Sequence, residues 1–322
     1  MVDSTKQAFL NALRAAPGQW QSGESLAKLL GISRSAVWKA AKELRSEGLL
    51  LESAPRRGYR MAEGGELFTV EEFRSLLEPI WQAEVWPSIS STNDRARAAA
   101  AAGNPGPLLI AAAEQTAGRG RRGRCYFSPA HSGLYFSVLL RPALSSVEVS
   151  LVTTAAAVAV LRALQRYGVD ITIRWVNDLM VGEKKVGGIL TESVFSLEDG
   201  GLEYLVAGFG LNLTAPANSF PAGLSDAGAI FEGAAPVSRA ELATSIALIF
   251  KQLVDALPDA DFLPEYRAAN LLQPGMTIRV FPLSGVSYPA LVREIDDVGR
   301  LEIELLSGER RRLSGGEISI VQ

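Results

Sequence analysis

The sequence is poor in two side chains that carry much of enzyme chemistry: its 322 residues include one cysteine, Cys125, and one histidine, His131. A single cysteine excludes an internal disulfide and is typical of a protein that works in a reducing cytoplasm. A zinc site of His and Cys ligands needs more of these residues than the chain has. Ser-His-Asp and Cys-His catalysis would both depend on His131. We therefore expect no protein-held metal centre, and we expect any chemistry to rest on Arg, Lys, Asp, Asn and backbone amides.

Long hydrophobic runs are also missing. The most apolar stretches, such as residues 151–164, contain Thr and Arg and are shorter than the roughly 20 residues of a membrane-spanning helix. The first residues, Met-Val-Asp-Ser-Thr-Lys, carry no apolar signal region. We therefore predict no membrane association. The 48% of hydrophobic residues is ample for the cores of two or three domains.

Charge is unevenly distributed along the chain. The net charge is −3, yet residues 1–61 hold ten Lys or Arg and five acidic residues, a local excess of +5. The remainder is correspondingly acidic. A basic N-terminal segment on an acidic body predicts a separate role for that segment, and nucleic acid is the partner that such a charge favours.

The basic segment has the pattern of a winged helix-turn-helix. A short predicted helix at 25–30 is followed by a turn, Gly31-Ile32-Ser33, and by a second helix at 34–47. Strands at 48–51 and 58–61 would flank a basic wing. An ordinary small helical domain or a protein-interaction module is the alternative. The predicted DNA-binding residues are Ser33, Arg34, Ser35, Lys39, Arg45, Arg56 and Arg57.

A seven-residue loop dominates the middle of the sequence. Residues 118–124 read Gly-Arg-Gly-Arg-Arg-Gly-Arg, shortly after an apolar run at 108–113 that is typical of a strand. Glycine lets the backbone turn tightly and approach a ligand, and the planar guanidinium of arginine pairs with carboxylates and phosphates. We call residues 118–124 the arginine loop and predict that it binds an anion. The alternative is a solvated basic loop.

The arginine loop does not fit three other glycine-rich loops. Its glycines have the spacing of the dinucleotide-binding fingerprint, but a strand-like run at 134–140 follows where that fingerprint needs a helix. A phosphate-binding P-loop would need Lys and Ser or Thr where Arg124 and Cys125 stand. The partner motifs of a protein kinase are missing. The loop therefore belongs to another class of anion site.

Further polar groups lie near the ends of predicted strands. Residues 91–93, Ser-Thr-Asn, follow a strand near 85–89, and they are either a helix N-cap or ligands for a polar head group. A hairpin is predicted at 180–190, and strand alternation places Lys184 and Lys185 on opposite faces, so that one of them faces a pocket. The neighbouring Gly187-Gly188 leaves space for a flat ligand.

The order of predicted elements indicates three domains with the boundaries 1–63, 66–272 and 273–322. The central domain mixes helices, including a long one at 147–167, with strands, and its loop at 214–229 is long enough to be a lid. The last domain has four short alternating strands, which predict a small β-barrel: 277–281, 288–295, 301–305 and 318–321.

Taken together, these motifs resemble the biotin protein ligase family, and the basic head makes the chain similar to the bifunctional type that is also the biotin operon repressor. The resemblance runs from about residue 5 to Ile320. It implies an α/β (α+β) fold with an N-terminal winged helix-turn-helix, a central mixed α/β domain like that of class II synthetases, and a C-terminal SH3-like barrel. The motifs are Ser91-Thr92-Asn93, Gln115, the arginine loop, Trp175-x-Asn177-Asp178, Lys185-x-Gly-Gly-Ile and Gly210-Leu-Asn212.

The resemblance implies two reactions and a regulatory role. Biotin and MgATP give biotinyl-5′-AMP and pyrophosphate, and a lysine of the biotin carboxyl carrier protein then takes the acyl group. Neither step needs an enzyme nucleophile, because positioning and charge stabilisation are sufficient. The implied partners are therefore biotin, ATP with Mg²⁺, the carrier protein and operator DNA. The adenylate is the implied co-repressor, and it promotes a homodimer.

The resemblance also assigns residues. Lys185, Arg121 and Asp178 are the implied catalytic residues, with Lys185 bridging the biotin carboxylate and the α-phosphate. The implied biotin site comprises Ser91, Thr92, Asn93, Gln115, Gly118, Arg119, Gly120, Arg121, Arg122, Lys185 and Gly188. The implied ATP or adenylate site comprises Arg121, Arg124, Asn177, Asp178 and Asn212.

Two departures from the family pattern stand near this site. Arg174-Trp-Val176 replaces the common Lys-Trp-Pro, and Cys125-Tyr126 replaces a Lys, Arg or Ser followed by Trp. Both affect packing rather than the polar groups. Three other hypotheses stay open: a biotin sensor without enzymatic activity, a ligase whose head regulates nothing, and a lipoate ligase.

Overall fold

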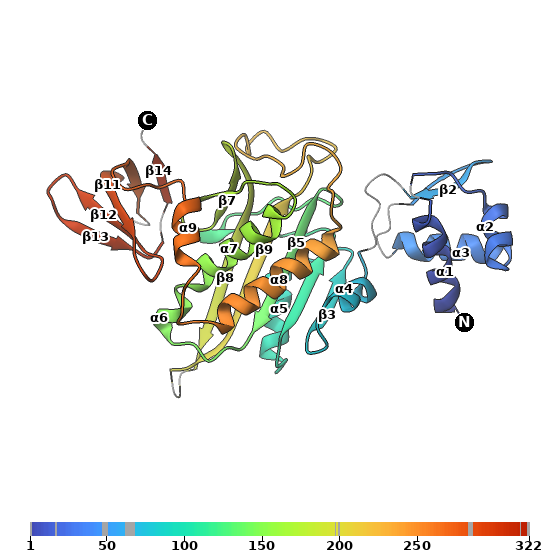
Figure 1. Cartoon of the computed structure of the whole chain (residues 1–322), viewed down its shortest axis with the longest axis horizontal. Helices are drawn as coiled ribbons and strands as arrows, with labels where there is room; N and C mark the ends of the chain where they lie inside the picture. Colours follow the sequence, from blue (N-terminus) through green and yellow to red (C-terminus); the bar gives the residue numbers. More distant parts are fainter. Residues whose placement is uncertain are drawn as a thin grey trace.

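The computed structural model describes residues 2–16, 18–46, 51–61, 68–196, 198, 200–282, 286–315 and 317–320. Three bodies follow one another along the chain: a small helical head, a central sheet covered by helices, and a second, smaller sheet (Figure 1). Residues 63–66, at the boundary between the first two predicted domains, lie outside the described residues. Among the described residues, no helix combines the length and the apolar character needed to cross a membrane.

The head is a winged helix-turn-helix. Ser22 caps the second helix through its hydroxyl, and Gly31, with φ of 65°, ends that helix in the left-handed conformation that glycine adopts most readily. The three helices enclose their own apolar core, which includes Phe9, Leu26 and Leu44. Of the strand predicted at 48–51, residues 48–50 lie outside the described part, and Leu51 belongs to β1. The elements are α1 (Val2–Arg14), α2 (Gly23–Leu30), α3 (Arg34–Ser46), β1 (Leu51–Ala54) and β2 (Gly58–Met61).

The central body is built on a seven-stranded mixed sheet with the order β3-β4-β5-β9-β8-β7-β6. β3 and β4 pair in parallel and every other neighbouring pair is antiparallel. The predicted hairpin is the pair β7–β8. The strands are β3 (Gln82–Trp86), β4 (Leu108–Ala112), β5 (Gly133–Leu140), β6 (Thr172–Arg174), β7 (Asp178–Val181), β8 (Lys184–Phe195) and β9 (Leu202–Asn212).

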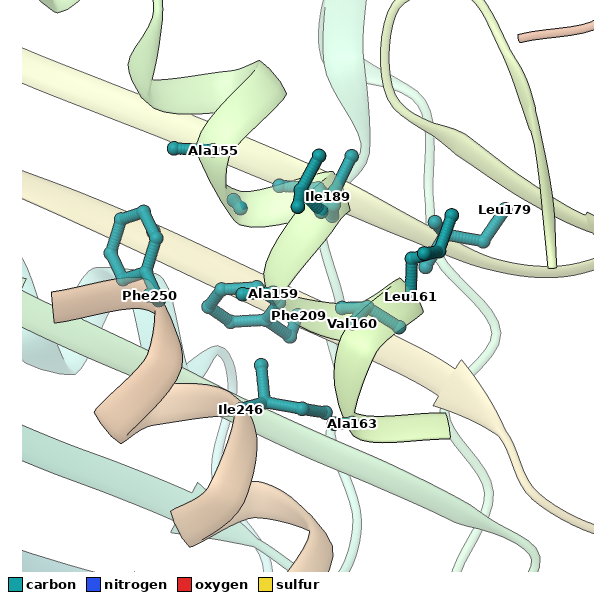
Figure 2. Close-up of a cluster of buried hydrophobic side chains, with 14 of the residues drawn as sticks. Ala155, Ala159, Val160, Leu161, Ala163, Leu179, Ile189, Phe209, Ile246 and Phe250 are labelled. Atoms are coloured by element: carbon teal, nitrogen blue, oxygen red, sulfur yellow. The ribbon is translucent and has the colours of Figure 1, made fainter. Parts of the chain in front are cut away.

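Helices cover both faces of this sheet. Side chains of α7 and α8 pack on one face, where the ring of Phe209 on β9 contacts that of Phe250 on α8 (Figure 2). The alternate residues of β4 face the other way and contact the alanine-rich face of α5. The two faces therefore have separate apolar clusters. The helices are α4 (Val70–Leu76), α5 (Thr92–Ala101), α6 (Ser146–Val149), α7 (Val152–Gln165), α8 (Arg239–Asp255) and α9 (Leu263–Ala269).

The long helix predicted at 147–167 is wrong in one respect, because it is divided into α6 and α7. Ser150 ends α6, and its hydroxyl donates to the carbonyl oxygen of Val147 at 2.6 Å and contacts that of Val298 at 3.1 Å. A serine that binds backbone carbonyls competes with regular helix geometry. The break places Leu151 in the core and brings the chain against the C-terminal sheet.

The C-terminal body is a five-stranded antiparallel sheet with the order β13-β12-β11-β10-β14. It shares the apolar core of the central body, and the indole Nε1 of Trp175 donates to the carbonyl oxygen of Gly299 at 3.1 Å. Our prediction missed β13, because Arg310-Arg311-Arg312 shows no apolar alternation. The strands are β10 (Thr277–Phe281), β11 (Tyr288–Ile295), β12 (Leu301–Leu305), β13 (Arg310–Leu313) and β14 (Glu317–Ile320).

Candidate functional site

A cavity of about 580 Å³ lies where the arginine loop, the start of α5 and the strands β7, β8 and β9 meet. The residues predicted from the sequence to bind biotin or ATP converge on it from segments more than 100 positions apart. Gly118 is the one member of that set that does not line the cavity. Those that do are Ser91, Thr92, Asn93, Gln115, Arg119, Gly120, Arg121, Arg122, Arg124, Asn177, Asp178, Lys185, Gly188 and Asn212.

Ser91 and Thr92 serve two purposes at the start of α5. Ser91 is the N-cap, and its hydroxyl accepts from the backbone N–H of Asp94 at 3.4 Å. Thr92 presents its backbone N–H and its hydroxyl to the side-chain oxygen of Gln115, at 2.9 and 3.2 Å. Gln115 in turn donates from Nε2 to the hydroxyl of Ser128. The two interpretations of this segment, cap and ligand site, are therefore compatible.

A buried hydroxyl fixes the next residue, Asn93. Ser137 on β5 is fully buried, and its Oγ lies 2.6 Å from Oδ1 of Asn93 and 2.7 Å from Oγ1 of Thr92. The amide nitrogen of Asn93 donates to the carbonyl oxygen of Leu190 and to Glu192. A Cβ at Gly208 would lie 2.0 Å from Oδ1 of Asn93, so the asparagine packs directly on the β9 backbone. These contacts leave Asn93 one orientation.

The arginine loop is a tight, internally bonded turn. The backbone N–H of Gly120 donates to the carbonyl oxygen of Arg124 at 2.7 Å, and that of Tyr126 donates to Gly118 at 2.8 Å. Arg122, with φ of 58°, and Gly123, with φ of 72°, turn the chain through the left-handed region. Gly118 lies behind the loop, where a Cβ would be 2.5 Å from the carbonyl oxygen of Tyr126. Its glycine is required for packing rather than for lining the cavity.

Arg121 is the arginine that reaches deepest. Its Nη1 donates to Oδ1 of Asn177 at 3.0 Å. Burial, followed by repulsion from Arg122, lowers the pKa of the Arg121 guanidinium from its usual value. A desolvated cation of this kind gains from an arriving anion, because charge pairs are stronger where water is excluded. A Cβ at Gly315, before β14, would lie 2.6 Å from Nη2 of Arg121, so the C-terminal body touches the same group.

Lys185 belongs to a chain of alternating charges that lines the cavity. Its Nζ lies 2.5 Å from Oδ1 of Asp178, and Arg174 binds Oδ2 of the same carboxylate at 2.7 Å. Arg174 also lies 3.6 Å from Asp226. Lys184 points elsewhere and donates to the carbonyl oxygen of Ser225 at 2.9 Å. As strand alternation predicted, one lysine of the pair faces the cavity.

Tyr126 forms an aromatic wall between the strands. Its ring lies against β9, where a Cβ at Gly210 would be 2.6 Å away, and its hydroxyl donates to Oδ1 of Asn212 at 3.2 Å. Burial raises the pKa of the Tyr126 hydroxyl well above 10.0. The phenol therefore stays neutral and acts as a hydrogen-bond donor. At Gly188 the nearest atom to an added Cβ is 3.8 Å away, which leaves open space beside this wall.

The loop predicted as a lid at 214–229 runs along the start of β8. The backbone N–H of Lys185 donates to the carbonyl oxygen of Asp226 at 2.7 Å, and that of Gly228 donates back to Lys185 at 2.9 Å. The amide nitrogen of Asn212 donates to the carbonyl oxygen of Gly228 at 3.0 Å. The loop contributes Phe220, Leu224 and Asp226 to the cavity lining. It is thus joined to the site by main-chain bonds.

The head carries a second candidate site on α3. The predicted DNA-binding residues there, Ser33, Arg34, Ser35, Lys39 and Arg45, are all exposed. Ser33 has a structural role as well, because its hydroxyl accepts from the backbone N–H of Ala36 at 3.2 Å. Lys39 lies 3.9 Å from Glu43. The exposed face of α3 therefore presents both charge and hydroxyl groups.

The basic wing is ordered by an aromatic side chain. The guanidinium groups of Arg57 and Arg60 lie over the ring of Trp20, 5.1 and 4.9 Å from its centroid. Arg56, in the turn between β1 and β2, has φ of 66° and is exposed. Arg45 differs from the others in the predicted set, since its Nε donates to the carbonyl oxygen of Leu51 at 2.8 Å and ties α3 to β1.

Sequence reasoning missed several residues of both sites. Ser137 and Glu192 lie in the middle of long strands, where a single polar residue carries no motif. Asp226 lies within a loop of weak pattern. Trp38 of α3 is 59% exposed and has the ammonium group of Lys42 5.4 Å from its ring centroid. An exposed Trp on a predicted recognition helix was the one available signal.

Comparisons with known proteins agree with this geometry. Residues 85–212 match the biotin/lipoate A/B protein ligase family, and residues 5–60 match a helix-turn-helix domain family. The chain is 31% identical over 322 residues to the bifunctional ligase/repressor BirA of Bacillus subtilis strain 168, covering 97% of each protein. It is 35% identical over 218 residues to BirA of Escherichia coli K12, covering 66% of this chain and 65% of that protein.

A solved structure shares the fold. The biotin protein ligase from Aquifex aeolicus, in complex with biotin and ATP, superposes with a TM-score of 0.59 at 21% identity, covering 75% of this chain and 99% of that one. The extent of the Bacillus match, which includes both the head and the cavity, decides the classification. The chain therefore belongs to the biotin/lipoate A/B protein ligase family and, within it, to the bifunctional ligase/repressor proteins.

Proposed function

We propose that the protein joins biotin to a lysine of a carrier protein in two steps and that it represses transcription through its head. In the first step, an oxygen of the biotin carboxylate attacks the α-phosphorus of ATP. The bond from that phosphorus to the bridging oxygen of the β-phosphate breaks, and pyrophosphate leaves. In the second step, a lysine amine attacks the acyl carbon of biotinyl-5′-AMP, AMP leaves, and the amine loses a proton.

The observation that carries this proposal is that Lys185, Arg121 and the Thr92–Gln115 pair line one cavity. Biotin's ureido ring would exchange hydrogen bonds with Thr92 and Gln115, and its carboxylate would lie toward Lys185. Negative charge grows on the phosphorus oxygens during the attack, and preorganised cations stabilise it. Neither step requires a nucleophile from the protein.

Asn177, Asp178 and Asn212 are proposed to serve the nucleotide. Asp178 and Asp226 are the carboxylates among the cavity-lining residues. No group of three or more His, Cys, Asp or Glu side chains that could hold a metal ion occurs in the part of the chain that the structure describes. Mg²⁺ commonly keeps several waters and binds through one or two carboxylates together with substrate phosphates. This donor set therefore fits Mg²⁺ that arrives with ATP and neutralises phosphate charge.

Pyrophosphate release tests the ligase proposal. Wild-type protein mixed with biotin and MgATP should release pyrophosphate, and lipoate in place of biotin should give none. Lys185→Ala should lower the rate of release by roughly 10²–10³-fold, whereas Lys251→Ala, on α8 and outside the cavity lining, should not change it. Release with lipoate alone would assign the chain to the lipoate branch of the family. No release with either acid would favour a biotin sensor.

Repression is proposed to act through the exposed face of α3 and the basic wing, with the adenylate as co-repressor that promotes a homodimer. Footprinting on genomic DNA around biotin-synthesis genes, with and without biotin and MgATP, tests DNA binding. Light scattering with and without biotinyl-5′-AMP tests dimerisation. No footprint under either condition would indicate a ligase whose head regulates nothing. We infer that the protein works in the cytoplasm, where its proposed carrier protein, ATP and DNA would meet it.

A further inference from the structure

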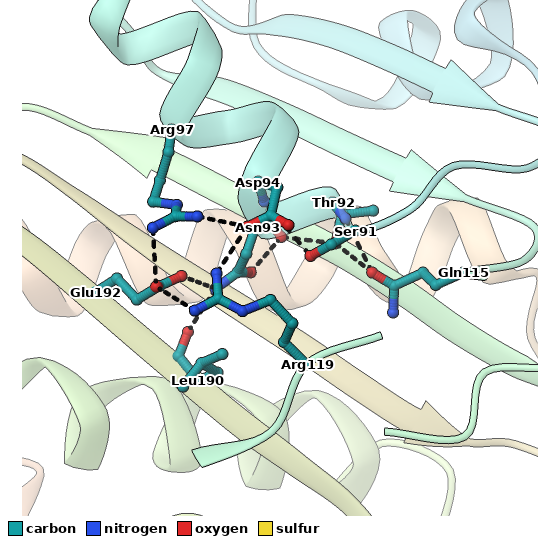
Figure 3. A network of polar contacts seen from close by, with 10 residues as sticks. Ser91, Thr92, Asn93, Asp94, Arg97, Gln115, Arg119, Leu190 and Glu192 are labelled. Atoms are coloured by element: carbon teal, nitrogen blue, oxygen red, sulfur yellow. Dashed lines mark hydrogen bonds and ion pairs between the residues drawn. The ribbon is translucent and has the colours of Figure 1, made fainter. Parts of the chain in front are cut away.

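A cluster of four charged side chains lies beside the cavity and ties three elements together (Figure 3). Arg119 of the arginine loop binds Asp94 at 2.7 Å and Glu192 at 3.2 Å. Arg97 of α5 binds the same two carboxylates, at 2.6 and 3.6 Å. The hydrogen bond to Asp94 is the main cause that raises the pKa of the Arg119 guanidinium. The charge of Arg119 is thus already matched inside the protein.

Glu192 is the inner member of this cluster. Its side chain is 20% exposed, whereas those of Arg119 and Asp94 are each 38% exposed. Its two carboxylate oxygens have different partners, because Oε1 faces Arg119 and Oε2 accepts from the amide nitrogen of Asn93 at 2.8 Å. One side chain therefore contacts both the root of the arginine loop and the start of α5.

Further hydrogen bonds connect Asn93 to Thr92 and Gln115, which line the cavity. Oδ1 of Asn93 lies 2.6 Å from the hydroxyl of Ser137, which lies 2.7 Å from the hydroxyl of Thr92. Thr92 in turn contacts Gln115. A continuous line of hydrogen bonds thus runs from the proposed ureido-binding pair to Glu192 and on to the arginine loop. Networks of this kind fix each member's orientation when every group is satisfied.

We propose that Glu192 is a positioning residue that fixes the arginine loop and the start of α5 relative to each other. It anchors the arginine loop through Arg119, and it orients Thr92 through Asn93 and Ser137. The proposal rests on the proposed ligase function, since it concerns how that site is held. Without Glu192, Arg119 would keep a single carboxylate partner in the loop's neighbourhood, Asp94, and the Asn93 amide would lose its charged acceptor.

Two variants separate these effects. Glu192→Ala removes both acceptors, while Glu192→Gln keeps the shape but has one oxygen to share between Asn93 and Arg119. We expect KM for biotin to rise on the order of tenfold in the alanine variant and less in the glutamine variant, because misplaced binding groups weaken a preorganised site. The kcat for pyrophosphate release should stay close to that of wild type, because Lys185 and Arg121 are unchanged. Glu203→Gln, on the exposed face of β9, is the matched control.

Trypsin provides a second readout, because the loop contains four arginines. Cleavage within 118–124 should be faster in Glu192→Ala than in wild type or Glu203→Gln. If Glu192 acts on the loop through Arg119, the double variant Arg119→Ala/Glu192→Ala should be cleaved no faster than the faster single variant. A purely structural role would instead lower thermal stability and leave the ratio of loop cleavage to cleavage elsewhere unchanged.

The outcomes distinguish this inference from the ligase proposal. Wild-type protein without pyrophosphate release would overturn the proposed function. Active wild type with unchanged KM and unchanged loop cleavage in both Glu192 variants would overturn the inference, as would a fall in kcat at constant KM. If neither variant folds, Arg119→Ala tests the loop anchor alone. Unchanged KM and cleavage in that variant would also overturn the inference.

Discussion

The ammonium nitrogen of Lys185 lies 2.5 Å from one carboxylate oxygen of Asp178, and Arg174 holds the other oxygen of that carboxylate at 2.7 Å. Lys185 is a compact point charge at the end of a flexible stem, and this pairing fixes where the charge stands. An arginine at the same position would be longer and planar, and its charge would be displaced.

We therefore predict that Lys185→Arg does not restore the activity lost in Lys185→Met. Both variants should lower kcat for pyrophosphate release by roughly 10²–10³-fold, the effect of removing one preorganised charge-stabilising group. Biotin binding, measured by calorimetry without ATP, should change far less. An arginine variant with activity close to wild type would show that charge alone, not its placement, is required.

Two neighbouring glycines of β8 should respond differently to a methyl group. A Cβ at Gly187 would lie 2.7 Å from the backbone oxygen of Gly210, while at Gly188 the nearest atom is 3.8 Å away. Gly187→Ala should cost about 1–3 kcal/mol of unfolding free energy by overpacking. Gly188→Ala should keep the melting temperature but weaken biotin binding, because its methyl group enters the cavity. Thermal melts and biotin titrations check this, and equal melting temperatures would contradict it.

The turn at 296–299, in which Gly299 accepts the hydrogen bond from Trp175, should lose stability at acidic pH. Burial alone would raise the pKa of Asp296, but hydrogen bonds from the side chain and backbone of Arg300 and from the backbone of Val298 outweigh it. The pKa therefore lies below its usual value of 3.8. A depressed folded-state pKa stabilises the fold above the unfolded-state pKa, and this stabilisation is lost as pH falls through the folded-state pKa.

Asp296→Asn should consequently lower the unfolding free energy by about 1–2 kcal/mol at pH 7, the range for a charge-assisted hydrogen bond with a partly exposed partner. The difference from wild type should shrink as the pH falls below about 4. Urea denaturation between pH 7 and pH 3 measures it, with the exposed Asp259→Asn as control. A difference that does not depend on pH would contradict the assigned protonation.

Substitutions of the two arginines near the ends of α3 should have different effects, one on DNA affinity and the other on the stability of the head. Arg34 is exposed, and its loss should weaken DNA binding similarly for all sequences and reduce the slope of log K against log salt by about one. Arg45 donates to the carbonyl oxygen of Leu51, so Arg45→Ala should chiefly lower the melting temperature of the head. Salt-dependent binding assays and thermal melts decide this, and the opposite assignment of effects would contradict it.

Cavity residues could be predicted from the sequence where a motif combines residue type with position along a strand or loop. Residues of the arginine loop, the Trp-x-Asn-Asp segment and the two-glycine strand line one cavity. The first two follow predictable strands, and the third lies within one. Gly118 was grouped with them by adjacency, yet it packs behind the loop against Tyr126. Whether a loop glycine faces a ligand or the protein depends on the fold of the loop, and local sequence does not encode that.

The elements and residues that the sequence did not predict depend on pairing between distant parts of the chain. β13 contains three consecutive arginines, and it pairs with β12, where Glu302 binds Arg310 and Arg312 and Glu304 binds Arg310. A charged strand that is stabilised by a charged neighbouring strand lacks the alternating hydrophobic pattern from which strands are predicted. Ser137 and Glu192 are similar cases, since their importance arises from partners 45 and 99 positions away along the chain, in the one case Thr92 and in the other Asn93.

Ile318, on the last strand, lines the cavity, and Gly315 lies against Arg121. The described helices and strands of the helix-turn-helix head, by contrast, end with β2 at Met61, and the head has an apolar core of its own. During translation, the helix-turn-helix head is therefore synthesised long before the last residues that line the cavity. Loss of a few C-terminal residues would remove a wall of the catalytic cavity while leaving the head intact. Such a product would keep the helix-turn-helix head but would lack part of the cavity that we propose binds biotin and ATP.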